Sequence, residues 1–402
     1  MKPIGSLITL DKAMEICFSS IKEILEEEKV HILEASGRVI SRDIISGINV
    51  PPFARSAMDG YGVIGENTFP AGQFKPVKLK CVDKIHAGMQ PVCTVKTGEC
   101  SQIATGAMIP EGADSVVIVE DTEKDGEDIL VYKPVYPGQN VSPSGEDIIK
   151  GSVVLRKSDF LTPSKTGVLA ALGMEYVDVY RKPKVVIITT GNEVKTPGAT
   201  LGTGQIYDVN SYTLHAVLTS HGVNAFIHEE IIEDEIEKIE EVIRLYENVD
   251  CLIFSGGSSV GERDVIIEAI SRHGEVLFHG IAVKPGKPTL FGKINDTLVF
   301  GMPGNPSSCL SNAYIMLVPI FRKMGHLPEE IIRKVKLPLF KRITSTLGRH
   351  QFLTVKIVNG EVKSAFKTSG AITSMSESDG YIEIPALVDL LEKGEMVEVI
   401  LF

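Results

Sequence analysis

The middle of the chain alternates short, wholly apolar runs with stretches whose apolar residues recur every three to four positions. Apolar runs at 185–188 and 251–254 have the length of buried strands. Stretches such as 234–245 and 264–273 carry apolar residues at helical spacing. Regular alternation of strands and helices predicts a doubly wound, mostly parallel α/β domain with helices on both faces of the sheet. We place this domain at 183–328.

A different pattern lies on either side of the predicted α/β domain. Between 62 and 145 short strand-like runs alternate with glycine and proline turns, without a helical period. This predicts a small β domain, inserted at 48–146. Near the C-terminus, apolar and polar residues alternate before the pair Asn359-Gly360, which predicts a β-hairpin. We therefore expect a small C-terminal β barrel at 329–402.

The remaining segments, 1–47 and 147–182, are expected to form a helical and linker region used for dimerisation. An amphipathic helix is predicted, beginning near Thr9 or Asp11 and ending near Lys29. A second helix is predicted to be capped by Thr162, followed by Pro163. In the α/β domain, Asn210 is the predicted cap of another helix.

Composition and charge narrow the class of protein. The 402 residues suffice for more than one domain, and 43% hydrophobic and 23% charged residues are ordinary for a soluble protein. A net charge of −11 argues against nonspecific nucleic-acid binding, and no apolar run could cross a membrane. We expect no export signal from the pattern of the first residues, and the six scattered cysteines indicate reduced thiols. We expect a cytoplasmic protein.

The stretch Cys251–Asp264, CLIFSGGSSVGERD, carries the clearest chemistry. An apolar strand stops at a turn that contains Gly256, Gly257 and Ser258. Glycines allow several backbone N–H groups to converge, and the following helix adds its positive end, so the turn suits a phosphate group. Gly-Gly-Ser alone is more often a flexible turn. A second glycine turn, at Gly191, follows the other predicted strand and favours a ligand site.

Two further loops carry groups that bind anions. Lys284 and Lys287 lie in the sequence Lys-Pro-Gly-Lys-Pro, where prolines stiffen the chain, so the two ammonium groups suit an oxyanion or phosphate. A single lysine would more often be a solvated surface residue. Asn305-Pro306 opens a predicted helix whose free N–H groups could also meet an anion.

Carboxylates occupy loop positions near these donors. They are Asp59, Asp147, Glu193, Asp234 and Asp264. Carboxylates beside a phosphate site usually bind a hard divalent cation such as Mg²⁺. Each one alone would more often be a turn or cap residue, and Asp234 and Asp264 stand where helix caps belong. The residues alone therefore predict a nucleotide-like anion with Mg²⁺ on an α/β domain.

Several motifs together resemble a known family. They are PPFARSAMDGYG, TGAMIPEGAD, SGEDI, TTGNEV, SGGSSVGERD, KPGKP and GMPGNP, in this order. The chain resembles the molybdopterin molybdenumtransferases of the MoeA type, a family that includes the C-terminal part of gephyrin. The resemblance extends over essentially the whole chain. It implies an elongated homodimer that binds adenylylated molybdopterin and molybdate, inserts molybdenum with the help of Mg²⁺, and releases AMP.

The resemblance also implies roles for individual residues. Catalytic roles are expected for Asp59, Asp264, Lys284 and Lys287. Metal ligation is expected for Glu193, Asp234 and Asp264. Substrate binding is expected for Thr105, Asp147, Glu193, Gly256, Gly257, Ser258, Asn305, Arg349 and Ser374.

Two alternatives from other functional classes stay open. One is an enzyme like molybdopterin adenylyltransferase, whose single domain resembles residues 183–326. The other is a non-enzymatic scaffold like gephyrin. Partners implied by the resemblance are the adenylyltransferase itself and apo-molybdoenzymes, with no membrane and no nucleic acid.

Overall fold

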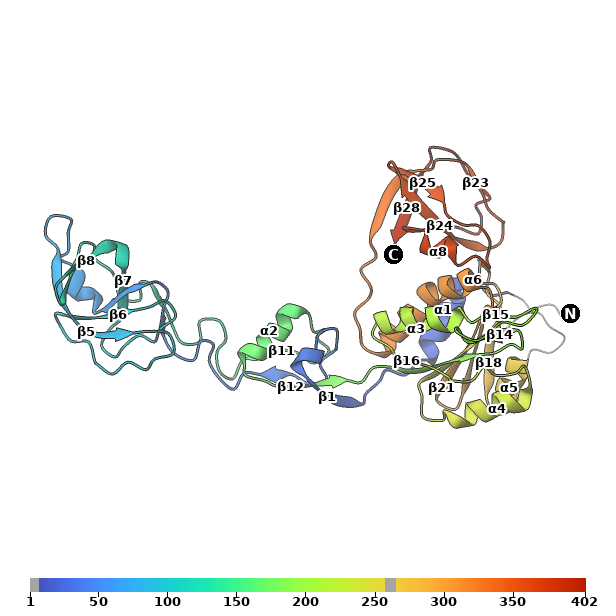
Figure 1. The fold of residues 1–402 in the computed structure, drawn as a ribbon, viewed down its shortest axis with the longest axis horizontal. Coiled ribbons are helices and arrows are strands. Elements are labelled where there is room, and N and C mark those ends of the chain that lie inside the picture. Colours follow the sequence, from blue (N-terminus) through green and yellow to red (C-terminus); the bar gives the residue numbers. More distant parts are fainter. Residues whose placement is uncertain (1–6, 257–264) are drawn as a thin grey trace. The chain divides into compact units, whose positions relative to one another are not determined.

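The computed structural model describes residues 7–256 and 265–402. The chain forms two compact units, which are described separately. Unit 1 comprises Met1–Glu28, Gly37–Val39 and Val179–Phe402, and unit 2 comprises Lys29–Ser36 and Ile40–Asp178. Figure 1 labels the helices and strands of both.

Unit 1 contains a six-stranded sheet in the order β16-β13-β17-β21-β20-β18. Its strands are β13 (Lys184–Thr189), β16 (Asn224–Ile227), β17 (Cys251–Ser255), β18 (Glu275–His279), β20 (Leu290–Ile294) and β21 (Thr297–Met302). The first four strands in this order are parallel, and β20 and β18 are antiparallel. The sheet is thus mixed, with an antiparallel edge that the alternating sequence pattern did not predict.

Helices cover both faces of this sheet, as predicted (Figure 1). Alternate residues of β13 enter different cores: Val185 and Ile187 face one, while Val186 and Ile188 face the other. The first core includes residues of α1 (Leu10–Ser20), α3 (Asn210–Ser220), α6 (Pro306–Asn312), the π-helical turn Ala313–Leu317 and α7 (Val318–Met324). The second includes residues of α4 (Ile236–Leu245) and α5 (Val265–His273).

The N-terminal helix is shorter than predicted. The helix α1 begins next to Thr9, as predicted, and the Thr9 side chain caps it by accepting from the Lys12 N–H. It ends at Ser20 rather than near Lys29. The hydroxyl of Ser20 donates to the Ile16 carbonyl, a competing bond that weakens helices. Ile21 is already extended, Ile24 enters the first core from this extended segment, and Glu27–His31 forms strand β1.

The predicted caps of two other helices had different outcomes. Thr162 accepts from the Lys165 N–H and caps α2 (Pro163–Ala171), as predicted. Asn210 does not cap α3, because it is the first helical residue and its amide donates to the Gly304 carbonyl at 2.9 Å. Asp208 accepts from the Ser211 N–H at 3.1 Å and takes the role of the cap.

The C-terminal part of unit 1 is a second six-stranded sheet, in the order β19-β24-β26-β28-β22, with β25 paired to β24. Its strands are β19 (Val283–Lys284), β22 (Lys334–Pro338), β24 (His350–Val358), β25 (Glu361–Ser364), β26 (Gly380–Ile384) and β28 (Met396–Leu401). Asn359 and Gly360 have φ of 54° and 78° between β24 and β25, which confirms the predicted hairpin turn. A bridge from Leu339 to Val362 brings the two ends of the sheet together.

Unit 2 contains a β domain whose sheet has the order β7-β4-β6-β5-β9-β8. The strands are β4 (Gly60–Val63), β5 (Val77–Ile85), β6 (Glu99–Ile103), β7 (Ser115–Ile118), β8 (Thr122–Asp125) and β9 (Asp128–Val131). Between residues 62 and 145, all of which the structure describes, there are 3-10 turns but no α-helix, in agreement with the sequence pattern.

Short strands complete the fold. They are β2 (Ile44–Ile45) with β11 (Val153–Leu155), β3 (Arg55–Ser56) with β10 (Val141–Ser142), β14 (Val194–Lys195) with β15 (Ile206–Tyr207), β23 (Ile343–Thr344) with β27 (Leu390–Leu391), and β12 (Tyr176–Tyr180). A short helix α8 spans Thr373–Ser376. No helix in the described part of the chain is long and apolar enough to span a membrane. All six cysteines are free, as predicted.

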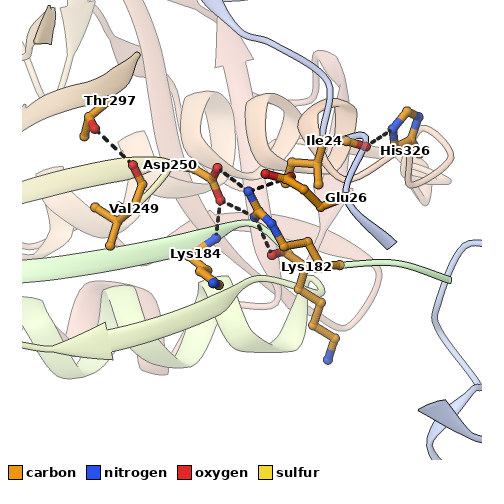
Figure 2. A network of polar contacts seen from close by, with 9 residues as sticks. Ile24, Glu26, Lys182, Lys184, Val249, Asp250, Thr297 and His326 are labelled. Carbon is orange, nitrogen blue, oxygen red and sulfur yellow. Dashed lines mark hydrogen bonds and ion pairs between the residues drawn. The ribbon is translucent and has the colours of Figure 1, made fainter. Parts of the chain in front are cut away.

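A polar network fixes the amino ends of the parallel strands. Arg181 donates to both carboxylate oxygens of Asp250 at 2.6 and 2.9 Å and lies 2.9 Å from Glu26. Asp250 also accepts from the Lys184 N–H at 2.7 Å. Figure 2 shows Glu26, Asp250 and Lys184 converging. The hydrogen bonds to the Asp250 carboxylate raise the pKa of the Arg181 guanidinium, so the guanidinium stays charged. The network is structural, and it leaves the carboxyl ends of the strands for ligands.

Candidate active site

The carboxyl ends of three neighbouring strands form one edge of the α/β sheet. Thr189, Ser255 and Met302, the last residues of β13, β17 and β21, lie in register. Glycine turns follow the first two strands, as the sequence predicted. Gly191 has φ of 129° and Gly256 has φ of 99°, values that residues with a side chain rarely adopt. Ligands of open α/β sheets bind at this edge.

The turn after β17 is packed tightly against the turn after β13. The Thr190 N–H donates to the Ser255 carbonyl at 3.0 Å. A Cβ added to Gly256 would lie 2.5 Å from the Thr190 carbonyl oxygen. Gly256 is therefore needed both for its backbone conformation and for the close approach of the two turns. Gly257 and Ser258, also predicted to bind substrate, lie outside the described residues.

Two of the predicted acids lie together beside these turns. The Glu193 carboxylate folds back over Gly191, at 3.0 Å from where a Cβ of that glycine would stand. Asp234 lies close to Thr190 and Glu193. Asp234 is accessible to solvent, but nearby protein atoms remove part of its hydration and thereby raise its pKa. The Thr190 hydroxyl lowers the pKa of Asp234, and the negative charge of Glu193 raises it. The structure thus brings two like charges to the ligand edge.

This pair of carboxylates fits a divalent cation, because a cation would remove the repulsion between them. The third predicted ligand, Asp264, lies outside the described residues. Among residues 7–256 and 265–402, no three His, Cys, Asp or Glu side chains are grouped so that they could hold a metal ion. Metal ligation by Glu193, Asp234 and Asp264 stays a prediction.

Replacing Glu193 tests the electrostatic coupling of this pair. We expect Glu193→Gln to lower the pKa of Asp234 toward its ordinary value, because one negative neighbour is removed. The partial loss of hydration, which is the larger cause, should keep the pKa of Asp234 above that value. Carboxyl carbon NMR across an acid titration would measure the change. Glu241→Gln, which removes an acid paired with Lys238 on α4, is the control. An unchanged or higher pKa for Asp234 would contradict the arrangement.

The lysine loop lies at the same sheet edge. It leads into β20, whose first residue Leu290 pairs with Gly301 near the end of β21. Val283 and Lys284 pair with His350 and Gln351 of the C-terminal sheet. The Lys284 ammonium donates to the Thr346 hydroxyl at 3.0 Å. The loop is thus held between the α/β sheet and the C-terminal domain.

Three other predicted substrate residues surround this region. Asn305 immediately precedes α6, as predicted, and its amide donates to the Ser369 hydroxyl at 3.1 Å. Ser374, on α8, is fully buried, and its hydroxyl accepts from the Lys367 N–H at 3.0 Å. Arg349 directly precedes β24 and is half-buried. Their substrate contacts stay a prediction.

The remaining predicted residues belong to unit 2. Asp59 accepts from both the N–H and the hydroxyl of Thr105, at 2.7 and 3.0 Å. A cavity of about 140 Å³ opens beside Asp59, and Lys84 and His86 contribute to its lining. The lining combines a carboxylate, an ammonium group and an imidazole, which suits a polar ligand. Asp147 is exposed, and its N–H donates to the Val50 carbonyl.

The two bonds from Thr105 predict a measurable effect on Asp59. The hydrogen bond from the Thr105 N–H lowers the pKa of Asp59 most, and the bond from the Thr105 hydroxyl lowers it further. Thr105→Val removes only the hydroxyl, so the pKa of Asp59 should rise but stay below its ordinary value. Because the folded-state pKa is depressed, these bonds stabilise the fold at neutral pH, and the effect is lost as pH falls through that pKa. Carboxyl NMR titration would show the rise. Thr94→Val, on another loop of the β domain, should leave Asp59 unchanged.

Sequence reasoning missed three residues that shape this site. Thr190 approaches the Asp234 carboxylate, Thr346 accepts from Lys284, and Asn312 holds the lysine loop. Only Asn312 had a signal in the sequence, as a polar residue at the start of the apolar stretch Ala313–Phe321. The other two act through contacts between distant segments.

Glycine turns, paired carboxylates and a lysine loop at one sheet edge are typical of α/β proteins that bind anionic ligands. Three family models identify the family. The model of the MoeA N-terminal region (domain I and II) matches residues 8–173, and that of a probable molybdopterin binding domain matches residues 186–323. The model of the MoeA C-terminal region (domain IV) matches residues 336–402. The chain belongs to the MoeA family, as its motifs indicated.

Relatives and solved structures agree with this placement. The chain is 35% identical to the molybdopterin molybdenumtransferase of Haemophilus influenzae, over 79% of this chain and 78% of the relative. It is 33% identical to that of Bacillus subtilis, over 94% and 90%. A crystal structure of a molybdopterin biosynthesis MoeA protein from Pyrococcus horikoshii matches with a TM-score of 0.85 and 40% identity, covering 98% of this chain and 99% of that one.

Proposed function

We propose that this chain inserts molybdenum from molybdate into adenylylated molybdopterin and releases AMP. It is a transferase of molybdenum cofactor biosynthesis. The observation that carries the proposal is the lysine loop at the same sheet edge as the two glycine turns. The chain around it matches the MoeA N-terminal model, the molybdopterin binding domain model and the MoeA C-terminal model. Such an edge offers positive charge and backbone donors for a pyrophosphate-like link and an oxyanion.

The residues of the edge can be given roles in this reaction. Lys284 and Lys287 bind the oxyanion, and the turn at Gly256 and Gly257, with Ser258, binds the phosphate link. Asn305, Arg349 and Ser374 support the substrate from α6 and the C-terminal domain. Neutralising charge that develops on the phosphate as AMP leaves is the largest catalytic contribution we expect.

The acids can be given roles as well. Glu193 and Asp234, together with Asp264, would hold Mg²⁺, which supplies charge neutralisation at the phosphate. The closeness of Glu193 and Asp234 supports this ligand set. Added Mg²⁺ should then lower the pKa of Asp234. Asp59, held by Thr105, and Asp147 would act from the β domain and its neighbouring segment on the bound substrate.

We also propose that the enzyme works as a homodimer whose active site takes residues from two chains. The proposal rests on the family resemblance and on the division of the predicted site residues between two compact units, with Asp59 in unit 2 and Lys287 in unit 1. Mixing inactive Asp59→Asn protein with inactive Lys287→Ala protein should restore part of the activity, because a mixed dimer would contain one intact site. A mixture that stays inactive while subunits exchange would show that each chain builds its own site.

The two alternatives are less well supported. A molybdopterin adenylyltransferase-like enzyme would not need the MoeA N-terminal and C-terminal regions, both of which are present. A scaffold would not need the paired carboxylates and the lysine loop. The adenylyltransferase and apo-molybdoenzymes fit better as partners that supply the substrate and receive the product.

The deciding experiment follows AMP release from adenylylated molybdopterin by the purified protein. AMP should appear only when both molybdate and Mg²⁺ are present, and a chelator should stop it. Parallel reactions with tungstate would define oxyanion preference. AMP release without any oxyanion, or none under all conditions, would overturn the proposed function. Full activity in excess chelator would remove Mg²⁺ from it.

A further inference from the structure

Asn312 is a polar side chain buried completely beneath the lysine loop. It is the last residue of α6, and the chain continues directly into the π-helical turn Ala313–Leu317. Its neighbours in the sequence are largely apolar and belong to the core. A buried amide in such a position is costly unless it is hydrogen-bonded, so its partners indicate why it is there.

The partners of Asn312 are all in the lysine loop and its exit. Its Nδ2 donates to the Gly286 carbonyl at 2.9 Å and to the Thr289 hydroxyl at 2.7 Å. The Thr289 hydroxyl donates in turn to the Gly286 carbonyl at 2.9 Å. Thr289 is also fully buried. One side chain of α6 thus closes a hydrogen-bonded ring with the loop that carries both lysines.

The shape of the loop depends on the same side chain. A Cβ added to Gly286 would lie 2.6 Å from Cγ of Asn312, so the carboxamide occupies the space that any other residue at 286 would need. Gly286 has φ of 105°, which glycine tolerates. The Lys287 carbonyl then accepts from the N–H groups of Ile281 and Thr289, both at 3.0 Å. The backbone on both sides of Lys287 is therefore fixed.

We propose that Asn312 is a positioning residue that sets the geometry of Lys284 and Lys287 for oxyanion binding. It does not touch the substrate and acts through the backbone of Gly286. The role of the two lysines rests on the proposed function, whereas the control of loop geometry by Asn312 does not. A small displacement of a binding group reduces catalysis strongly, so a polar anchor beneath the loop has a functional consequence beyond stability.

Asn312→Leu, which keeps a similar volume and removes the donor, is the test. We expect amide hydrogen exchange at Ile281 and Thr289 to become roughly tenfold faster or more, while exchange in β13 and β17 stays unchanged. The molybdate concentration that gives half-maximal AMP release should rise about tenfold or more. Ser311→Ala is the matched control, because Ser311 precedes Asn312 on the same helix and contacts Met375 instead of the loop.

A second variant approaches the same contact from the loop. Thr289→Val removes the hydroxyl that joins Asn312 to Gly286, and its effect on loop exchange should not add to that of Asn312→Leu in the double variant. This comparison keeps the proposal testable where one variant folds poorly. Wild-type exchange at Ile281 and Thr289 in Asn312→Leu, or an equal effect of Ser311→Ala, would overturn it. Loss of molybdate dependence in the wild-type protein would refute the proposed function, and the exchange measurement would still decide the role of Asn312.

Discussion

Lys287→Ala should reduce molybdate-dependent AMP release by about a hundredfold or more while leaving the fold intact. Lys287 extends from a loop whose backbone is fixed by the Ile281 and Thr289 N–H groups, so its ammonium is presented without reorganisation. In the described part of the chain its side chain takes part in no ion pair. The substitution would remove positive charge from the proposed oxyanion site and leave the packed core untouched. Steady-state rates, with circular dichroism to check the fold, would measure the effect.

A suitable control is Lys293→Ala on β20, the strand that the loop enters. Lys293 lies near the opposite end of that strand, where its ammonium is 3.7 Å from Asp296. The Lys293→Ala substitution removes the same charge as Lys287→Ala. Wild-type activity in Lys293→Ala would therefore show that the position of the lysine matters and the net charge of the protein does not. Comparable losses in both variants, or wild-type activity in Lys287→Ala, would remove Lys287 from the site.

The ligand edge could be predicted from sequence because its parts are local. An apolar run that ends in glycine, as at Phe254 to Gly256, indicates a buried strand and its turn without knowledge of the rest of the fold. Parallel strands then place their carboxyl ends at one edge, so two such turns must lie near each other. The register of Thr189 with Ser255 agrees with that reasoning.

Other features depended on contacts that the sequence does not encode locally. The end of α1 was predicted too late, because charged residues after Ile21 are compatible with a solvent-exposed helix face as well as with strand β1. Asn210 looked like a cap by residue type, yet its amide bonds to Gly304, far along the chain. The antiparallel strands β18 and β20 share the apolar pattern of parallel ones.

The same limit applies to the candidate site. Glu193 and Asp234 were named separately, and only the fold brings them together beside Gly191. Asn312 and Thr346 support the lysine loop from two different domains, and neither follows a motif. Sequence patterns identify groups that can do chemistry, whereas the residues that position those groups emerge from packing.

Gly256→Ala should nearly abolish activity and lower the free energy of unfolding by about 2 kcal/mol or more. The added Cβ would stand 2.5 Å from the Thr190 carbonyl oxygen, and a φ of 99° is strained for alanine. The two turns must separate to relieve the clash, which weakens the bond from the Thr190 N–H to Ser255. Because Asp234 contacts Thr190, the acidic pair would move with it. Chemical denaturation and AMP release, measured on the same preparation, would report the two effects.

Gly167→Ala provides the matched substitution. Gly167 lies within α2, without a positive φ and with no atom within 4 Å of the added Cβ, so alanine there should be neutral or stabilise the fold by up to about 1 kcal/mol. Activity in that variant should stay at the wild-type level. If Gly256→Ala also retained stability and turnover, the close approach of the two turns would be unnecessary for the site. Loss of activity with unchanged stability would instead assign Gly256 to the substrate contact alone.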